Sequence, residues 1–424
     1  MACRFPPSYS AATHQHSSLF PGIASKDFIP NSTEPAGIST KPLFEPFGIL
    51  MKRANEFLKK NHRVQVKTCE SVEFKLDSDG TPRIQKMTYS ECDSQTITYL
   101  RGLRLWLVPR DDPSHPPQQL GYFNTMPNIV SLNIGTPDFE PLDTVIDRIN
   151  KKLRIQPIEG RILNVETQEM KYKGYSKHGM DPDRSCWKEY TNAELLFVYI
   201  LRVFYEVEDP SYEIIGCADF LPECKDNGGI FADPTYEPFS QVIKKASAWC
   251  YHNSRTRFCN AQTMCYKLKS GGVNTKRMHF VEHGQTSTCF VKILRVVYAT
   301  PFVPMEVAPP FLIMNSKTFE PVALSTGGII STPKYESLDQ TKKRISAWIA
   351  ATGARVLSVE TRDERMNAME KSEGPNSSYT INTGRSCSHK MVFRVYFDGN
   401  YQELPPEVLP PLPTLEDDSC CNII

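Results

Sequence analysis

The segment His279-Phe-Val-Glu282-His283 has the residue types of an inverted zinc-peptidase motif. In that motif two histidines bind the metal from one face of a helix, and the glutamate acts as the general base. This segment instead favours a β-strand within a polar loop, and Gly284 follows it at once. In a strand the two histidines would lie about 13 Å apart, which is too far for one zinc ion. Zinc hydrolysis at His279, Glu282 and His283 is therefore the enzymatic alternative and not the main hypothesis, and we expect no cofactor.

An arginine recurs in four strongly apolar segments, and an acidic or amide residue recurs in the segment before each of them. The four arginines are Arg104, Arg202, Arg295 and Arg394, and their counterparts are Glu70, Glu166, Gln262 and Glu360. Neighbouring antiparallel strands place such residues opposite each other, where a bidentate arginine–carboxylate pair fits. We interpret the four sets as structural cross-strand pairs on the less buried face of a sheet. Convergence of the four arginines on one anionic ligand is the functional alternative.

The last residues carry two further motifs. The end of the chain, Cys420-Cys421-Asn422-Ile423-Ile424, resembles a C-terminal prenylation box, in which Cys421 would carry the prenyl group and Cys420 a palmitoyl group. The terminal isoleucine and the acidic flank at 416–418 depart from the usual pattern, so an unmodified tail with two thiols is the alternative. Upstream, Pro410-Pro411-Leu412-Pro413 resembles a proline-rich ligand of WW-type domains within an extended polyproline tether. These motifs indicate other proteins and the cytoplasmic membrane face as partners.

Composition and missing motifs exclude several classes of function. No phosphate-binding loop, dinucleotide-binding fingerprint or serine-hydrolase elbow occurs in the sequence. The 49 basic and 48 acidic residues leave a net charge of +1, which removes the electrostatic attraction expected of a nucleic-acid-binding protein. The 13 cysteines are scattered without paired spacing, so we expect reduced thiols in place of disulfides or a structural zinc site. The first 18 residues contain no continuous apolar stretch, which favours the cytoplasm.

Four related segments organise these residues. An aromatic residue followed by glutamate recurs at Phe44, Phe139, Tyr236 and Tyr335, at spacings of 95, 97 and 99 residues. Behind each aromatic residue lie an amphipathic helix pattern, a strand with the acidic or amide residue, a polar loop with a weaker β segment, and a final strand with the arginine. The sequence therefore predicts an α+β fold of four tandem repeats. Each repeat is expected to contain an arm, one amphipathic helix and a two- or three-stranded antiparallel meander.

We place the repeats at residues 19–113, 114–211, 212–301 and 302–402, between a disordered N-terminus (1–18) and a proline-rich tail (403–424). Because the shared positions are those that architecture requires, we expect a non-enzymatic interaction or scaffold protein in the cytoplasm, tethered to the cytoplasmic membrane face by its lipidated tail. A binding protein with sites for a small hydrophobic or anionic ligand between repeats is the alternative. The third repeat differs by Gln262 and by the histidine-containing loop, so any special activity is expected there.

Overall fold

The structure is a computed structural model. It describes residues 22–34, 43–77, 80–91, 96–112, 114–132, 137–172, 180–190, 195–228, 234–268, 272–282, 288–302, 310–325, 333–366, 374–382 and 387–412. The predicted N-terminal segment 1–18 and the predicted lipidation residues Cys420 and Cys421 lie outside these ranges.

Four α-helices of similar length follow the aromatic-Glu motifs. They are α1 (Phe47–Lys60), α2 (Leu142–Ile155), α3 (Phe239–His252) and α4 (Leu338–Thr352). The first three begin directly after a proline in extended conformation, and Ser337 caps α4 by accepting a hydrogen bond from the Gln340 amide. Each helix buries the apolar stripe that the sequence predicts, for example Phe47, Leu50 and Ala54 in α1.

The glutamate of each motif fixes the helix to the chain segment before it. Glu45 accepts hydrogen bonds from the amide and side chain of Asn31, at 2.9 and 3.2 Å, and from Arg53 of α1 at 3.0 Å. Arg53 also donates to the backbone oxygen of Ile29. The same arrangement joins Glu140 to Asn128 and Arg148, Glu237 to Lys245, and Glu336 to Arg344. A charge-assisted contact therefore sets the angle at which each helix starts.

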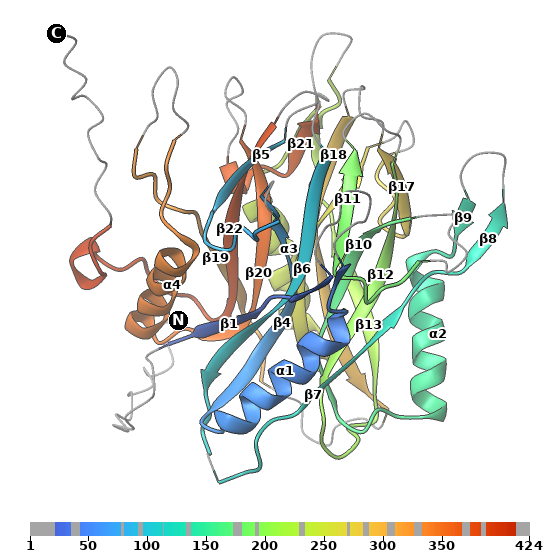
Figure 1. Cartoon of the computed structure of the whole chain (residues 1–424), viewed down its shortest axis with the longest axis horizontal. Coiled ribbons are helices and arrows are strands. Elements are labelled where there is room, and N and C mark those ends of the chain that lie inside the picture. The colour runs from blue at the N-terminus through green and yellow to red at the C-terminus, as the bar shows by residue number, and fades with distance from the viewer. Residues whose placement is uncertain are drawn as a thin grey trace, which may run out of the picture.

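Within the described ranges, four antiparallel sheets of four strands each form the body of the molecule (Figure 1). Sheet I contains β1 (Ala24–Phe28), β4 (Val64–Lys75), β6 (Thr96–Pro109) and β11 (Cys186–Tyr190). Sheet II contains β7 (Leu120–Thr125), β10 (Arg161–Lys171), β12 (Leu195–Glu206) and β17 (His279–Glu282). Sheet III contains β13 (Glu213–Phe220), β16 (Arg257–Lys267), β18 (Thr288–Pro301) and β21 (Tyr379–Asn382). Sheet IV contains β19 (Met314–Phe319), β20 (Arg355–Met366), β22 (Cys387–Asp398) and β5 (Thr88–Glu91).

Short hairpins and turns lie outside these sheets. Three two-stranded hairpins are β2 (Ser32–Glu34) with β3 (Leu43–Phe44), β8 (Ile129–Leu132) with β9 (Pro137–Phe139), and β14 (Cys224–Asp226) with β15 (Thr235–Tyr236). Two 3-10 turns, η1 (Gly374–Asn376) and η2 (Pro406–Val408), complete the described elements. In Figure 1 the β8–β9 hairpin projects from the body beside α2.

The weaker β segment of each loop pairs in a different sheet from the one expected. A meander would keep it beside the strands of its own segment, but β11 pairs with β6, β17 with β12, β21 with β18, and β5 with β22. The lengths of the strands explain this difference. In β6, residues Leu103–Leu107 pair with the short strand β1, so the edge at residues 96–100 is open to β11. Sheets I to III are therefore each completed by a strand from the next segment of the chain, and sheet IV is completed by β5 of the first segment.

The strands exchanged between sheets and the packing of the helices close the four sheets into a ring. The inner strands β4, β10, β16 and β20 contact one another in cyclic order, with β20 returning to β4. Each helix also packs against the first strand of the next sheet: α1 on β7, α2 on β13, α3 on β19 and α4 on β1. The hydrophobic clusters follow the same order, since Ile23 and Trp106 of the first segment join the cluster beneath α4. The overall class is α+β, as the sequence predicts.

The start of the tail is folded and not a fully extended tether. After Asp398 the chain turns at Gly399 and places Tyr401 against Trp348 and Phe397, with ring centroids 6.5 and 5.2 Å apart. Leu409, which follows η2, packs on the same cluster. The prediction of an extended polyproline segment was therefore wrong for residues 406–408, which form the 3-10 turn η2 and bring Leu409 onto the cluster of α4 and sheet IV.

Candidate functional site

The predicted arginine and acidic residues meet along the inner strands of the ring. The strand registers place Glu70 opposite Arg104, Glu166 opposite Arg202, Gln262 opposite Arg295, and Glu360 opposite Arg394. The prediction that these pairs lie on a less buried sheet face was wrong, because each arginine is at most 1% exposed. Direct ion pairing also differs from the prediction: only Arg394 contacts its own counterpart, at 3.2 Å from Glu360. Buried guanidinium groups need other partners.

Each arginine reaches across to a hydroxyl group of the neighbouring sheet. The donor and acceptor pairs are Arg104 to Thr361 at 2.9 Å, Arg202 to Ser71 at 2.7 Å, Arg295 to Thr167 at 3.0 Å, and Arg394 to Thr263 at 2.6 Å. Every one of these contacts joins two different sheets. The arginines therefore cross-link the ring and do not converge on one shared ligand, as the functional alternative would require.

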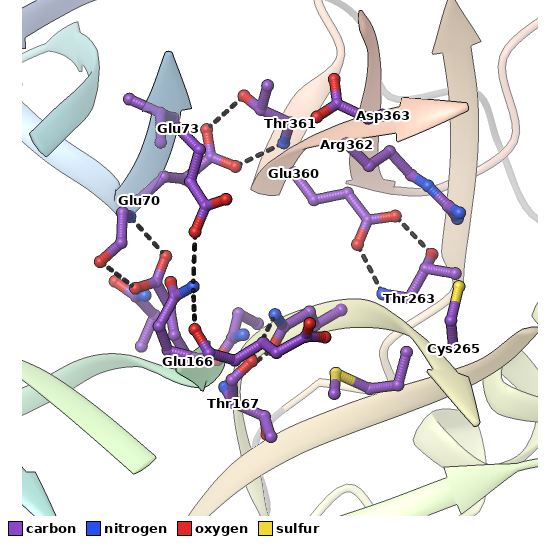
Figure 2. Close-up of a pocket in the computed structure, with 18 of the residues that line it drawn as sticks. Glu70, Glu73, Glu166, Thr167, Thr263, Cys265, Glu360, Thr361, Arg362 and Asp363 are labelled. Atoms are coloured by element: carbon purple, nitrogen blue, oxygen red, sulfur yellow. Dashed lines mark hydrogen bonds between the residues drawn. The ribbon is translucent and has the colours of Figure 1, made fainter. Parts of the chain in front are cut away.

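The same four hydroxyl-bearing residues donate hydrogen bonds to the acidic or amide residues of the next sheet. The amide and hydroxyl of Ser71 both donate to Glu166 at 2.7 Å, and those of Thr263 both donate to Glu360. The Thr167 amide donates to Gln262 at 2.9 Å, and the amide and hydroxyl of Thr361 both donate to Glu70. Figure 2 shows the two bonds between Thr361 and Glu70 and the two between Thr263 and Glu360. The four arginines, the four hydroxyl-bearing residues and the four acidic or amide residues thus form one hydrogen-bonded belt. This belt is continuous from sheet I through sheet IV and back to sheet I.

A second set of contacts lies one step along the inner strands and is incomplete. The Asn164 side chain bonds the amide and carbonyl of Cys69 at 3.0 and 2.9 Å, and the Asn260 side chain bonds those of Val165. At the corresponding position of β4 stands Thr68, whose buried hydroxyl has no hydrogen-bond partner within the described part of the chain. The seam between sheets IV and I therefore has one link fewer than its neighbours.

Charge is balanced separately at each of the four arginines. The residue of the first sheet strand that lies opposite the arginine is Asp27, Asn124, Asp219 or Thr318 in sheets I to IV. Arg295 pairs bidentately with Asp219, at 2.7 and 2.9 Å, and its inner-strand counterpart is the neutral Gln262. In sheets II and IV the neutral residues are Asn124 and Thr318, and the inner-strand residue is a glutamate. Gln262 thus belongs to a charge-balanced belt, and the prediction of special activity in the third repeat loses that support.

Sheet I differs because it carries both carboxylates. Arg104 pairs bidentately with Asp27, at 2.7 and 2.8 Å, and Glu70 lies opposite on the inner strand. Lys342 of α4 supplies a second cation, 2.9 Å from Asp27. Burial raises the pKa of Glu70 to about 7, against the attraction of Arg104. Burial alone would raise the pKa of Asp27, but the charges and hydrogen bonds of Arg104 and Lys342 hold the pKa of that carboxyl well below its usual range. The contribution of Glu70 to stability is therefore expected to depend on pH near neutrality.

A cavity of about 340 Å³ lies on the inner strands beside the belt. Its lining includes six carboxylates and two cations: Glu70, Glu73, Glu166, Glu169, Glu360 and Asp363, with Lys171 and Arg362. Figure 2 shows how the labelled side chains of the inner strands surround this space, with Glu73 and Asp363 beyond Glu70 and Glu360. The cavity is therefore polar and acidic.

The polar groups of this cavity are held by one another. Glu73 accepts a hydrogen bond from Arg101 at 2.7 Å, and the Arg101 guanidinium lies 4.5 Å from the Trp187 ring centroid. Arg362 lies 3.0 Å from Glu364, which also pairs with Lys292. Catalysis by a nucleophile requires a hydroxyl or thiol next to a general base. The belt hydroxyls do lie next to carboxylates, but each of those carboxylates also accepts a hydrogen bond from a backbone amide. This arrangement is typical of a structural link between two strands.

The remaining predicted residues are not among those that form this belt, or they lie outside the described residues. His279 lies in strand β17, with its ring 5.2 Å from the Phe139 ring, so the helix that zinc-peptidase chemistry requires is not formed. His283 is outside the described residues, and within them no group of three metal-binding side chains occurs. Pro410, Pro411 and Leu412 are exposed, and Pro413 is not among the described residues. No helix in the described ranges is long and apolar enough to cross a bilayer.

Sequence reasoning missed the hydroxyl-bearing residues of the belt, although their signal was present. Ser71, Thr167, Thr263 and Thr361 each directly follow the acidic or amide residue in the sequence. A hydroxyl at the same place in all four segments is the pattern that could have revealed them. The hydroxyl partner of each arginine could not be predicted, since it lies 128 to 131 positions away in three segments and 257 positions away for Arg104.

Comparison with protein-family models, with curated proteins and with solved structures gives no match to this chain. The geometry of the belt, the cavities and the surface therefore carries the functional argument.

Proposed function

We propose that residues 19–113, 114–211, 212–301 and 302–402 are four copies of one structural unit. The support is the common order of elements and the matching positions of the belt residues. In each segment a first strand, a helix, a bulged inner strand, an exchanged strand and a long last strand follow one another. A single unit of one helix on a few strands would be marginally stable alone, and closure into a ring supplies each unit with two neighbours.

We further propose that the protein is a non-enzymatic interaction or scaffold protein. The observation that carries this proposal is that the buried polar residues bind one another. The four arginines and their counterparts join each sheet to the next in a closed belt. In an enzyme, groups of this kind face a substrate and keep a free coordination or hydrogen-bond position. Here they make a rigid closed body, which suits a protein that presents surfaces to partners.

The β8–β9 hairpin is the surface that we propose contacts a protein partner. Ile129, Val130 and Leu132 are 44%, 66% and 81% exposed, and within the described part of the chain their strand β8 pairs only with β9. The hairpin at the matching place in the first segment carries Ser32, Thr33 and Glu34 instead. Apolar side chains on an unpaired strand edge are typical of strand addition by an extended peptide, where backbone hydrogen bonds supply affinity.

The test compares three forms of the full chain expressed in cells of its source. They are the unchanged protein, the double variant V130S/L132S, and the control T33A/E34A on the polar hairpin. After mild cross-linking, proteins retained by each form are quantified by mass spectrometry. We expect a defined set to be retained by the unchanged protein and the control, and to be lost from V130S/L132S. Equal retention by all three forms, or none above a tag alone, would contradict the proposal.

Attachment to the cytoplasmic membrane face through Cys421, with Cys420 as a second acylation site, remains a proposal from sequence. It rests on the resemblance of the last residues to a prenylation box. One lipid gives weak membrane binding and two give stable anchoring. Mass spectrometry of the C-terminal peptide from native cells should find a prenyl group on Cys421. A free Cys421 in front of an intact Ile424 would contradict the tether.

The cavity between the sheets favours a second candidate, a binding protein for a small ligand. Six lining carboxylates against two cations favour a cationic ligand over the hydrophobic or anionic ligand of the alternative drawn from the sequence. Calorimetric titration of the full chain with spermidine would test it. The variant E73Q, at a half-buried carboxylate of the lining, should weaken binding severalfold, and absence of heat at millimolar spermidine would dismiss this candidate.

A further inference from the structure

Cations gather at the opposite end of the inner strands from the acidic cavity. Arg161, Arg257 and Arg355 are the first residues of β10, β16 and β20, and Lys67 lies early in β4. All four line one second cavity of about 300 Å³, which shares no lining residue with the first. Asp398 is the one carboxylate among the residues that line it. The ring therefore has an acidic cavity on one side of the belt and a basic cavity on the other.

Lys67 occupies a position that the other inner strands give to apolar residues. Each inner strand has a β-bulge here, between Val66 and Thr68 in β4. The bulged residues of the other strands are Leu163, Cys259 and Leu357, which pack into the hydrophobic clusters of neighbouring sheets. A lysine at this place costs desolvation energy for its ammonium group, which the leucine and cysteine side chains do not incur.

The three arginines have acidic partners, whereas Lys67 has none within the described ranges. Arg257 lies 2.6 Å from Glu213, Arg161 lies 3.1 Å from Glu206, and Arg355 lies 3.1 Å from Asp398. No carboxylate or carbonyl oxygen of the described residues is paired with the Lys67 ammonium group. Burial and then the charges of Arg355, Arg161 and Arg257 lower the pKa of Lys67. A partly buried cation among three others lacks a counter-ion.

The other walls of this cavity are aromatic and apolar. Trp249, Phe258 and Tyr298 line it beside Leu312, and the Trp249 and Tyr298 ring centroids lie 5.1 Å apart. Thr256 and Ser254 add hydroxyl groups. Arg355 is exposed at the rim, with a side chain 69% accessible to solvent, so a ligand can reach the cations from outside. The arrangement has a charged end and an apolar wall.

We propose that this cavity binds the phosphate group of a small organic phosphate ester, with Lys67 as its central contact and Arg161, Arg257 and Arg355 around it. Guanidinium groups match the oxygens of phosphate in pairs, and an ammonium group acts as a compact point charge. A dianion would compensate the unpaired Lys67 and the cations around it better than a single carboxylate. The aromatic wall accommodates the organic part, since stacked or edge contacts on rings add to affinity.

Titration calorimetry of the full chain tests this proposal with three probes in a low-salt buffer without phosphate. We expect phenyl phosphate to bind with one site per chain, inorganic phosphate to bind at least about tenfold more weakly because it lacks the ring, and neutral phenol to give no heat. Binding of phenyl phosphate should weaken as sodium chloride is raised, because salt screens the cations.

Two variants identify the site. K67L restores the residue type that β10 and β20 carry at this bulge, so it should fold, unfold at a higher temperature than the unchanged chain without ligand, and bind phenyl phosphate at least tenfold more weakly. R355Q, at the exposed rim, should weaken binding severalfold, and K52M on the outer face of α1 is the control that should not. Unchanged affinity in both K67L and R355Q, or no binding of phenyl phosphate at millimolar concentration, would overturn the proposal.

Discussion

The replacement of Gln262 by glutamate tests the charge balance of the belt. Gln262 accepts a hydrogen bond from the Thr167 amide at 2.9 Å and donates one to the Thr167 carbonyl at 3.1 Å. Arg295 is already neutralised by Asp219. A glutamate here loses the donor to a buried carbonyl and adds a second negative charge at an arginine that has one. The Q262E variant should therefore be destabilised at neutral pH.

The magnitude follows from Glu70, which stands in the equivalent place in sheet I. Burial raises the pKa of Glu70 from 4.5 to about 7. A shift of that size corresponds to about 3 kcal/mol of unfolding free energy when the carboxyl is ionised in both states. Because the folded-state pKa is raised, this loss is absent below the unfolded pKa of about 4.5 and grows until the pH passes about 7. A protonated carboxyl would also restore the donor to Thr167.

The assay is urea unfolding followed by circular dichroism at about pH 5 and about pH 8. Q262E should lose about 3 kcal/mol relative to the unchanged chain at the higher pH and under about 1 kcal/mol at the lower. The double variant D219N/Q262E recreates the Asn124 and Glu166 combination of sheet II and should recover most of the loss. Q241E, an exposed position on α3, is the control and should change stability by less than about 0.5 kcal/mol. Equal losses of unfolding free energy at both pH values, or no recovery of stability in the double variant, would contradict the charge balance proposed for Arg295.

Three further substitutions test the belt and the sheets by the same unfolding assay. T263V removes the hydroxyl group that donates a hydrogen bond to Glu360 and should lower the free energy of unfolding by about 2 kcal/mol. A change below about 0.5 kcal/mol would contradict a structural role for this hydroxyl. T68N supplies a side-chain amide at the incomplete seam and should raise stability by about 1 kcal/mol; a loss would show that the seam has no room for it. G216A should cost about 1–3 kcal/mol because its methyl group would meet the Tyr298 ring 2.3 Å away, and a neutral result would mean that the ring moves freely.

The helices and the strand register could be predicted because their signals are local. The apolar stripe of α1, from Phe47 to Ala54, has the helical period and is buried as that period requires. An arginine recurs at the place of Arg104 in all four segments, and a glutamate or glutamine recurs at the place of Glu70, so their opposite positions follow from one antiparallel pairing. Such patterns need no knowledge of distant residues.

Burial and strand exchange could not be predicted because their causes lie far along the chain. Arg104 in a Leu-Arg-Leu alternation resembles a residue on a solvated sheet face, and its hydroxyl partner Thr361 stands 257 positions away. The short segment Thr88–Glu91 has β character, but nothing in it specifies pairing with β22 at the far end of the chain. The charge balance at Arg295 could not be predicted for the same reason, since its partner Asp219 precedes α3 in the sequence and Gln262 follows α3.

Amide hydrogen exchange at the four belt residues tests most directly whether the belt is closed. The amides of Ser71, Thr167, Thr263 and Thr361 each donate to a side chain of the neighbouring sheet. Thr361 is the amide whose bond to Glu70 joins the last sheet to the first. A closed belt predicts that all four amides exchange slowly, at rates within about tenfold of one another, because each opens only with the whole ring. Exchange of Thr361 on the timescale of an exposed strand edge, with the other three protected, would show an open ring and contradict the account.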